Sequence, residues 1–187
     1  MKKILLCTLL AGASLAASAE PAVYAIDPTH TFVTFEVKHF GTSTNRGRFD
    51  KKEGTVVLDK AAKTGKVEVT IDTSSINTGT APFDDHLKKA FFISSEFSTA
   101  RFVSDKIVFV GDKVDAVEGQ LTLLGKTQPV TLKASSFNCY DNPMLKREVC
   151  GGDFDATITR SNWGVGYGLP VIPDRVHLLI QVEAIKQ

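Results

Sequence analysis

The chain has 187 residues, 43% hydrophobic and 23% charged, with a formal net charge of +1 at pH 7. This length is enough for one domain with a well-filled core. Lys and Glu are scattered and form no basic run, which argues against nucleic acid or another polyanion as the partner.

The first 19 residues have the pattern of a cleaved signal peptide. Lys2 and Lys3 precede an apolar run that starts at Ile4, and small residues at 17–19 supply the cleavage site. We therefore expect export, with residues 1–19 removed and residues 20–187 forming a single domain. The apolar run is too short for a membrane span, and no later segment qualifies, so the protein is predicted not to span a membrane.

Alternation of apolar and polar residues predicts strands along most of the remaining chain. Gly111-Asp112-Lys113 lies between two such runs and is typical of a hairpin turn, so the flanking strands should pair antiparallel. The predicted strands are residues 31–40, 46–58, 66–72, 100–110, 114–124, 130–137, 154–163 and 175–185.

One segment has helical and not strand spacing. Leu87 and Phe91 recur at i and i+4 within residues 84–92, which predicts a short helix. Asp84 or Asp85 can cap its N-terminus. A helix this short is unstable alone in water, so its apolar side is expected to dock on the strands.

About eight antiparallel strands with short turns predict an all-β fold, closed into a barrel or split into a sandwich. An eight-stranded barrel holds either its own side chains or one small ligand, and the sequence leaves these two equally open. A hollow interior would suit a lipid, because the inward residues are apolar. The apolar residues expected to line it are Val33, Phe35, Val37, Val69, Ile71, Phe91, Leu121, Leu123, Ile158, Leu178 and Ile180.

Once Cys7 is lost with the leader, Cys139 and Cys150 form an even pair in an exported chain. Oxidising conditions outside the cytoplasm favour a disulfide between them. The bridge should pin one long loop and stabilise the protein by roughly 3 kcal/mol through chain entropy. A metal site is not expected, because no His lies near these cysteines in the sequence.

Four other residues could carry chemistry or contact a ligand. His39 falls on the apolar face of its strand, His86 lies at the predicted helix start, and Trp163 lies in a glycine-rich stretch that could line a cavity mouth. Arg160 shares a face with apolar residues and must find a partner, either a carboxylate of the fold or an anionic head group.

No motif for nucleophilic catalysis is present, so no catalytic residue and no cofactor are expected. The alternative is an enzyme acting on a lipid or small hydrophobic substrate, with His39, His86 and Arg160 as its acid-base and anion-binding groups.

Several stretches, taken together and in order, resemble the YceI-like, polyisoprenoid-binding family. They are YAIDPTHTFVTFEVKHFG (24–41), SSINTG (74–79), DDHLKKAFF (84–92), ARFVS (100–104), GQLTLLGKTQPVTL (119–132) and FDATITRSNWGV (154–165). The chain departs from the family pattern at Phe83, where Arg is usual, and at Phe97-Ser98, where Tyr-Pro is usual.

The resemblance implies a lipocalin-like barrel in the periplasm, or secreted as the alternative. It implies that a long isoprenoid or fatty acyl lipid is bound there without catalysis.

Apolar residues expected on the outer face, such as Phe32 and Phe40, also make a homodimer a prediction of the sequence.

Overall fold

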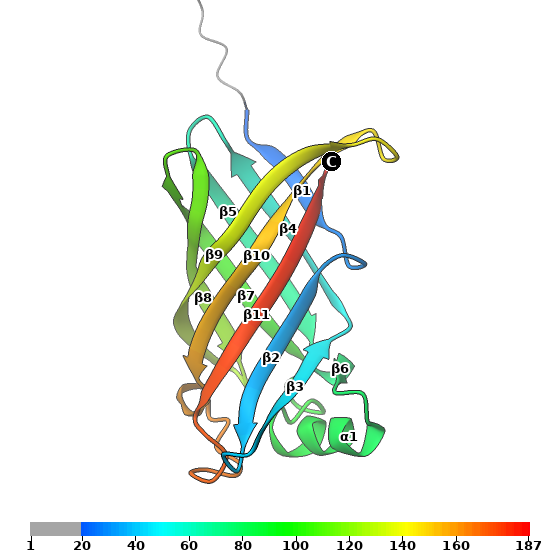
Figure 1. Ribbon diagram of the computed structural model, residues 1–187, viewed down its shortest axis with the longest axis vertical. Coiled ribbons are helices and arrows are strands. Elements are labelled where there is room, and N and C mark those ends of the chain that lie inside the picture. The colour runs from blue at the N-terminus through cyan, green and yellow to red at the C-terminus, as the bar shows by residue number, and fades with distance from the viewer. Residues whose placement is uncertain (1–19) are drawn as a thin grey trace, which may run out of the picture.

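The structure is a computed structural model that describes residues 20–187, so the predicted signal peptide lies outside the described residues. It is an antiparallel barrel with one α-helix at one end (Figure 1). The strands are β1 (Ala22–Ile26), β2 (Phe32–His39), β3 (Ser43–Phe49), β4 (Lys52–Asp59), β5 (Thr64–Asp72), β6 (Ile76–Asn77), β7 (Thr99–Val110), β8 (Lys113–Leu123), β9 (Lys126–Asn142), β10 (Arg147–Thr159) and β11 (Arg175–Lys186). The helices are α1 (Ala81–Ala90) and two 3-10 turns, η1 (Thr73–Ser75) and η2 (Arg160–Trp163).

The eleven strand segments make a closed barrel of eight strands, because some segments are two halves of one bent strand. β11 pairs with β1 through Ala184–Lys186 and with β2 through residues 177–181. The next position in the barrel is filled by β4 against β1 and by β3 against β2. The predicted barrel of about eight strands is thus confirmed, although β1 was not foreseen and the predicted strand 46–58 breaks after Phe49.

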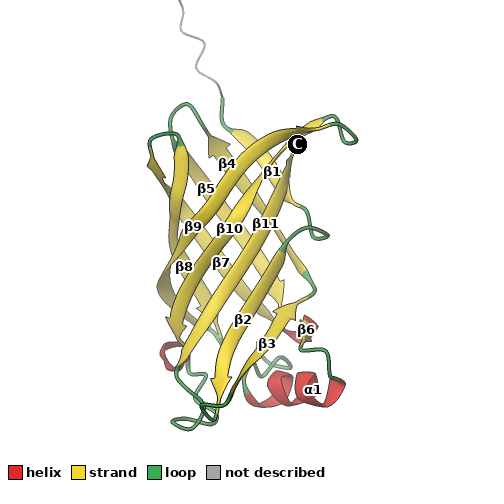
Figure 2. Cartoon of the chain, in the orientation of Figure 1, coloured by secondary structure: helices red, strands yellow, loops and turns green. Residues whose placement is uncertain are grey.

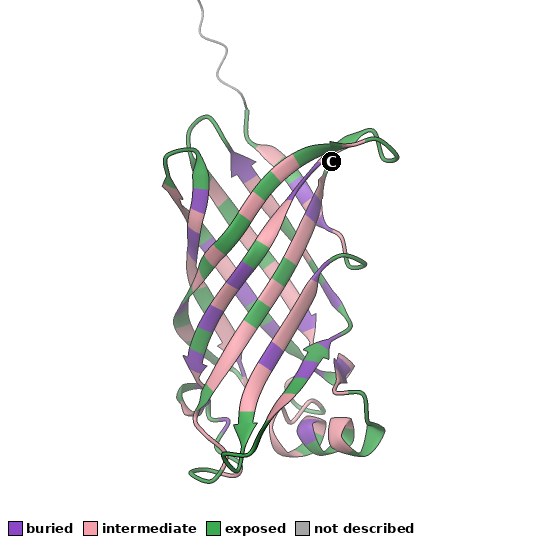
Figure 3. Ribbon diagram, viewed as in Figure 1, coloured by how far each residue is buried: buried purple, intermediate pink, exposed green. Residues whose placement is uncertain are grey.

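Exposure alternates along the strands, as the sequence pattern requires for a barrel (Figure 3). Inward side chains such as Phe35, Phe102 and Ile158 belong to one apolar core at the α1 end and middle of the barrel. A second buried cluster, which includes Tyr24, Leu58 and Cys150, fills the opposite end. The interior is therefore apolar along its whole length.

A polar network holds the end of the barrel opposite α1. The Glu148 carboxylate accepts hydrogen bonds from the Tyr24 hydroxyl and from Lys60. Burial by itself would raise the pKa of Glu148, but these hydrogen bonds and the charges of Lys60 and Lys186 outweigh it and hold the pKa below its ordinary value. Glu148 therefore stays ionised and accepts these hydrogen bonds from Tyr24 and Lys60 as a carboxylate.

The predicted disulfide is confirmed, but the prediction that it pins a long loop is wrong. Cys139 on β9 and Cys150 on β10 are directly opposite each other in the sheet, with their Cα atoms 4.0 Å apart. The hairpin continues beyond them to a short tip at residues 143–146. Polar residues on both strands obscured the alternation there, so the sequence pattern was that of a loop.

The helix α1 lies across one end of the barrel (Figure 2) and starts three residues before the predicted segment 84–92. Pro82 occupies its first turn, where the missing N–H costs nothing. The predicted cap by Asp84 or Asp85 is wrong, because Thr80 holds the N-cap position and makes no side-chain bond there. Asp84 instead accepts hydrogen bonds from the backbone N–H and the hydroxyl of Thr78. It therefore stabilises the turn that leads into the helix.

None of the helices within residues 20–187 combines the length and the apolar character needed to cross a bilayer.

Candidate functional site

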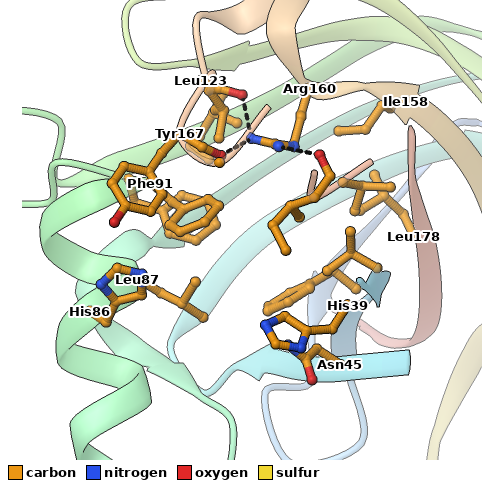
Figure 4. A pocket seen from close by; sticks show the side chains of 18 of the residues that line it. His39, Asn45, His86, Leu87, Phe91, Leu123, Ile158, Arg160, Tyr167 and Leu178 are labelled. Carbon is orange, nitrogen blue, oxygen red and sulfur yellow. Dashed lines mark hydrogen bonds between the residues drawn. The ribbon is translucent and has the colours of Figure 1, made fainter. Parts of the chain in front are cut away.

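A cavity of about 710 Å³ occupies the barrel beneath α1. Its walls come from the inward faces of several strands, including Phe35 on β2 and Ile158 on β10, while Leu87 of α1 and Phe91 at its C-terminal end close one side. Figure 4 shows Leu87, Phe91 and Ile158 converging on the space from different sides. The volume lies in the range of small-molecule sites, and the lining is predominantly apolar.

The hollow continues deeper into the barrel as a second apolar cavity of about 150 Å³. The two cavities share four lining residues, which we call the neck: Val33, Ile71, Leu121 and Leu178. The interior is thus an elongated space that narrows at the neck. The sequence had left a filled barrel equally open, and the structure selects the hollow one.

The structure brings nearly all of the predicted lining residues together. Val69 and Ile180 contact only the second cavity. Trp163 lines neither cavity: it is 2% exposed, and its Nε1 donates to the Leu121 carbonyl at 2.9 Å. The remaining residues line the larger cavity, namely Val33, Phe35, Val37, His39, Ile71, Phe91, Leu121, Leu123, Ile158, Arg160 and Leu178.

The glycine-rich stretch that follows η2 was expected to line the cavity mouth, but sequence reasoning did not name its apolar lining residues. Val165, Leu169, Val171 and Ile172 line the cavity from a loop with no regular periodicity. Phe83 of α1, where the family usually has Arg, also lines the cavity. The glycine and proline content of the loop was the available signal, but it indicates a turn and not the direction of each side chain.

Arg160 is buried at 4% exposure and holds this loop through its backbone. Four of its five N–H groups donate to backbone carbonyls at 2.7–3.0 Å. The acceptors are the carbonyls of Val165, Tyr167, Ile172 and Pro173. The expected partner, a carboxylate or an anionic head group, is therefore replaced by the protein's own backbone.

The charge of Arg160 is balanced only from a distance. Burial lowers the pKa of the guanidinium, and the nearby Asp174 carboxylate partly opposes this shift. Asp174 itself accepts from the backbone N–H and the hydroxyl of Ser161 and makes no hydrogen bond to Arg160. The guanidinium carbon lies 5.6 Å from the Phe91 ring centroid, within cation–π range.

The two histidines of the alternative mechanism lie at the cavity mouth. His39 is exposed at the end of β2, with its ring 4.5 Å from that of Phe40. His86 on α1 lies 5.6 Å from the Phe91 ring and 5.2 Å from the Tyr167 ring. Among the described residues, none that line this cavity is Asp, Glu, Ser, Thr, Cys or Lys. Neither histidine therefore has a cavity carboxylate to orient it or a Ser, Thr or Cys nucleophile to activate, and the one hydroxyl in the lining is the phenol of Tyr167.

A metal centre has little support in the described part of the chain. The three potential ligands that lie close together there are Cys139, Glu148 and Cys150. Both sulfur atoms are joined in the disulfide. They are not the thiolates that a metal would require.

The outer-face aromatics differ from what the sequence suggested. Phe32 is partly covered, because the guanidinium of Arg48 and the ammonium of Lys52 lie 5.2 and 4.9 Å from its ring centroid. Phe40 is 62% exposed, but it belongs to the cavity mouth.

Residues 24–184 match the model of the YceI-like domain. The chain belongs to the YceI-like family. Among its relatives, the UPF0312 protein PA0423 of Pseudomonas aeruginosa is 37% identical over 193 residues and Protein YceI of Salmonella arizonae 36% identical over 192, each with full coverage of both chains.

Solved structures of YceI-type barrels share the fold. BcnA of Burkholderia cenocepacia superposes with a TM-score of 0.70 at 25% identity, covering 84% of this chain and 98% of that one. A polyisoprenoid binding domain from Saccharophagus degradans, implicated in plant cell wall breakdown, gives 0.65 at 18% identity, covering 89% and 99%. At that identity the second likeness shows the fold alone.

Proposed function

We propose that this YceI-like protein is an exported, periplasmic carrier or sequestering protein that binds one long-chain lipid, a polyisoprenoid or fatty acyl chain, inside the barrel without catalysis. The observation that carries the proposal is the elongated apolar hollow, with a main cavity of about 710 Å³ that continues past the neck.

Burial of a hydrocarbon tail can supply the binding energy. Each methylene removed from water contributes about 0.8 kcal/mol, so ten methylenes contribute roughly 8 kcal/mol before costs. The translational and rotational freedom that the ligand loses on binding opposes this by roughly 4 to 15 kcal/mol. A long chain therefore binds with useful affinity, whereas a short one does not. This favours a ligand that reaches past the neck.

The comparisons support the same class of ligand. The chain is similar along its whole length to YceI proteins, and a protein of the same fold is named for binding polyisoprenoids. An exported protein with a disulfide also fits the periplasm, where thiols oxidise.

An enzyme acting on a hydrophobic substrate is the weaker candidate. It requires Arg160 to bind an anion, yet four of its N–H groups are already bonded to backbone carbonyls.

The test is mass spectrometry of the protein purified from its native host. We expect the intact mass to match a chain that begins at Glu20. The organic extract should contain about one long-chain lipid per protein. Delipidated protein should then rebind added isoprenoid alcohols. If the extract holds no stoichiometric lipid and no added isoprenoid binds, the carrier function is wrong.

A further inference from the structure

Four large apolar side chains are exposed around the mouth of the main cavity, and we call them the rim: Phe40, Tyr167, Leu169 and Val171. Their exposed fractions run from 36% to 62%, although each of them also lines the cavity. They come from two loops at the α1 end of the barrel, the β2–β3 turn and the segment after η2 (Figure 1). The apolar lining of the hollow therefore continues onto the outer surface of the protein.

Phe40 has a backbone conformation that is unfavourable for its side chain. Phe40 and Gly41 are the central residues of a turn closed by a hydrogen bond from the Thr42 N–H to the His39 carbonyl at 3.0 Å, and their φ angles are 50° and 69°. Asn-Gly is the usual pair in such a turn, because positive φ is strained for a bulky side chain. Burial does not offset this strain, since the His39 ring at 4.5 Å still leaves Phe40 62% exposed. An exposed phenylalanine at a strained position indicates a contact made outside the chain.

The two rim loops contain no acidic residue. Residues 164–173 have no charged side chain, and the fixed charges in residues 38–46 are Lys38 and Arg46. Arg46 is paired with Glu36, whereas Lys38 is exposed and forms no ion pair within the described part of the chain. The neighbouring helix α1 adds two acidic and two basic residues, which cancel. The rim is thus an apolar surface with a cation at its border, a combination that favours a membrane with anionic lipids.

The opposite end of the barrel also exposes apolar side chains, but they lie among charges. Met144 and Leu145 at the tip of the β9–β10 hairpin are 86% and 47% exposed. Residues 141–148 around them include two acidic and two basic side chains. Entry into the apolar part of a bilayer would remove water from these charges, which is costly. Of the two ends, the mouth end is therefore better suited to enter a membrane surface.

A bilayer also fits the position of the rim at the opening of the hollow. A long tail that moved between a membrane and the cavity through water would expose all of its methylenes. A mouth held against the bilayer avoids this exposure, whereas a second copy seated rim to rim would close both mouths. Tyr167 supports the bilayer as well, because the amphipathic ring of tyrosine is typical of the membrane interface.

We propose that the rim and Lys38 dock on the surface of a bilayer that contains anionic lipids, with Phe40, Leu169 and Val171 in the head-group region and the cavity mouth facing the membrane. This inference rests on the proposed function, which it extends by naming the partner surface from which lipid enters the cavity.

The experiment measures flotation of the delipidated protein with vesicles of phosphatidylethanolamine and phosphatidylglycerol, or of phosphatidylcholine alone. Wild-type protein should bind the anionic vesicles more tightly than the phosphatidylcholine vesicles. Phe40→Asn should weaken binding to the anionic vesicles about ten-fold, since a ring is withdrawn from the bilayer. Its melting temperature should stay near that of the wild type, because Asn tolerates positive φ. Met144→Asn is the matched control: it removes an exposed apolar side chain from the opposite end and should leave vesicle binding unchanged.

Lys38→Gln tests the contribution of charge. It should weaken binding to the anionic vesicles about five-fold and leave binding to phosphatidylcholine unchanged, because it removes a cation that faces the anionic surface. Lys66→Gln is the control, since Lys66 is exposed near the start of β5, at the end of the barrel away from α1. It should change neither affinity.

The outcomes separate this inference from the function it rests on. Wild-type protein that floats with neither kind of vesicle overturns the docking surface, as does equal binding by Phe40→Asn and the wild type. A wild-type dimer in analytical ultracentrifugation that Phe40→Asn converts to a monomer would make the rim a contact between copies, which also overturns membrane docking. Each of these results leaves lipid binding intact, because the organic extract measures it separately. If the extract holds no lipid and no added isoprenoid binds, the proposed function itself is wrong, whether or not the protein floats.

Discussion

Arg160 shows how a buried charge can be structural in a cavity wall that looks functional. Its guanidinium replaces the hydrogen bonds that the loop carbonyls would otherwise make to water, and its rigid fork reaches four of them at once. An arginine on the apolar face of a strand correctly predicted a buried polar contact. The partner was unpredictable, because carbonyls of an irregular loop leave no pattern in the sequence.

Replacing Arg160 by Lys should destabilise the protein even though the charge is kept. An ammonium is one point with three donors, so at least one loop carbonyl loses its partner, at about 1–3 kcal/mol for each buried group left unsatisfied. Urea unfolding measures the loss, and limited proteolysis should cut first within residues 164–174. Arg101→Lys is the control, since Arg101 is exposed and paired with Glu68, and it should change stability by less than about 1 kcal/mol. Equal stability of the two variants would contradict this role.

Among the elements, β10 contains two glycines that the close approach of its neighbours requires. A Cβ on Gly151 would lie 2.2 Å from the Val182 carbonyl oxygen, and one on Gly152 would lie 2.1 Å from that of Ser136. The pairing register shifts just beyond them, between Asp153 and Phe154. Glycine therefore lets both flanking strands pack tightly where the β9–β10 pair is irregular.

Gly152→Ala should lower the melting temperature by several degrees. The backbone oxygen cannot move aside cheaply, and overpacking of this kind costs about 1–3 kcal/mol, with about 2–4 °C lost per kcal/mol for a domain of this size. Thermal unfolding followed by circular dichroism provides the measurement. Gly166→Ala is the matched control, because its new methyl group would have no neighbour closer than 4.0 Å. The steric account fails if both variants melt at the wild-type temperature.

The elements that the sequence predicts well are those whose environment repeats along the chain. β5, β8 and β11 each alternate between the interior and solvent, so their inward residues could be named in advance. The start of α1 was missed because Pro82 looks like a breaker although it is tolerated in a first turn. Which of residues 164–172 line the cavity was not predicted, because Arg160 fixes the backbone of this loop through its carbonyls and the loop has no period.

At the scale of the whole molecule, the barrel provides one interior divided unevenly by the neck. Strands far apart in the sequence contribute to it: β2, β5, β8 and β11 supply Val33, Ile71, Leu121 and Leu178. Sequence alternation predicts that these residues point inward. It cannot predict where the interior narrows, because that depends on how side chains from opposite walls meet.

The neck should set the length of chain that the protein accepts. In Val33→Phe a ring is added at the neck, so a tail can still fill the main cavity but cannot pass beyond it. We expect the affinity for a fifteen-carbon isoprenoid alcohol to stay within about three-fold, and that for a forty-carbon alcohol to fall at least about ten-fold, since each methylene left unburied costs about 0.8 kcal/mol. Displacement of a fluorescent fatty acid measures both. Thr34→Phe adds a ring to the outer face of the same strand, next to Val33, and should leave both affinities unchanged. A uniform loss for short and long chains in Val33→Phe would mean that the deeper cavity takes no part in binding.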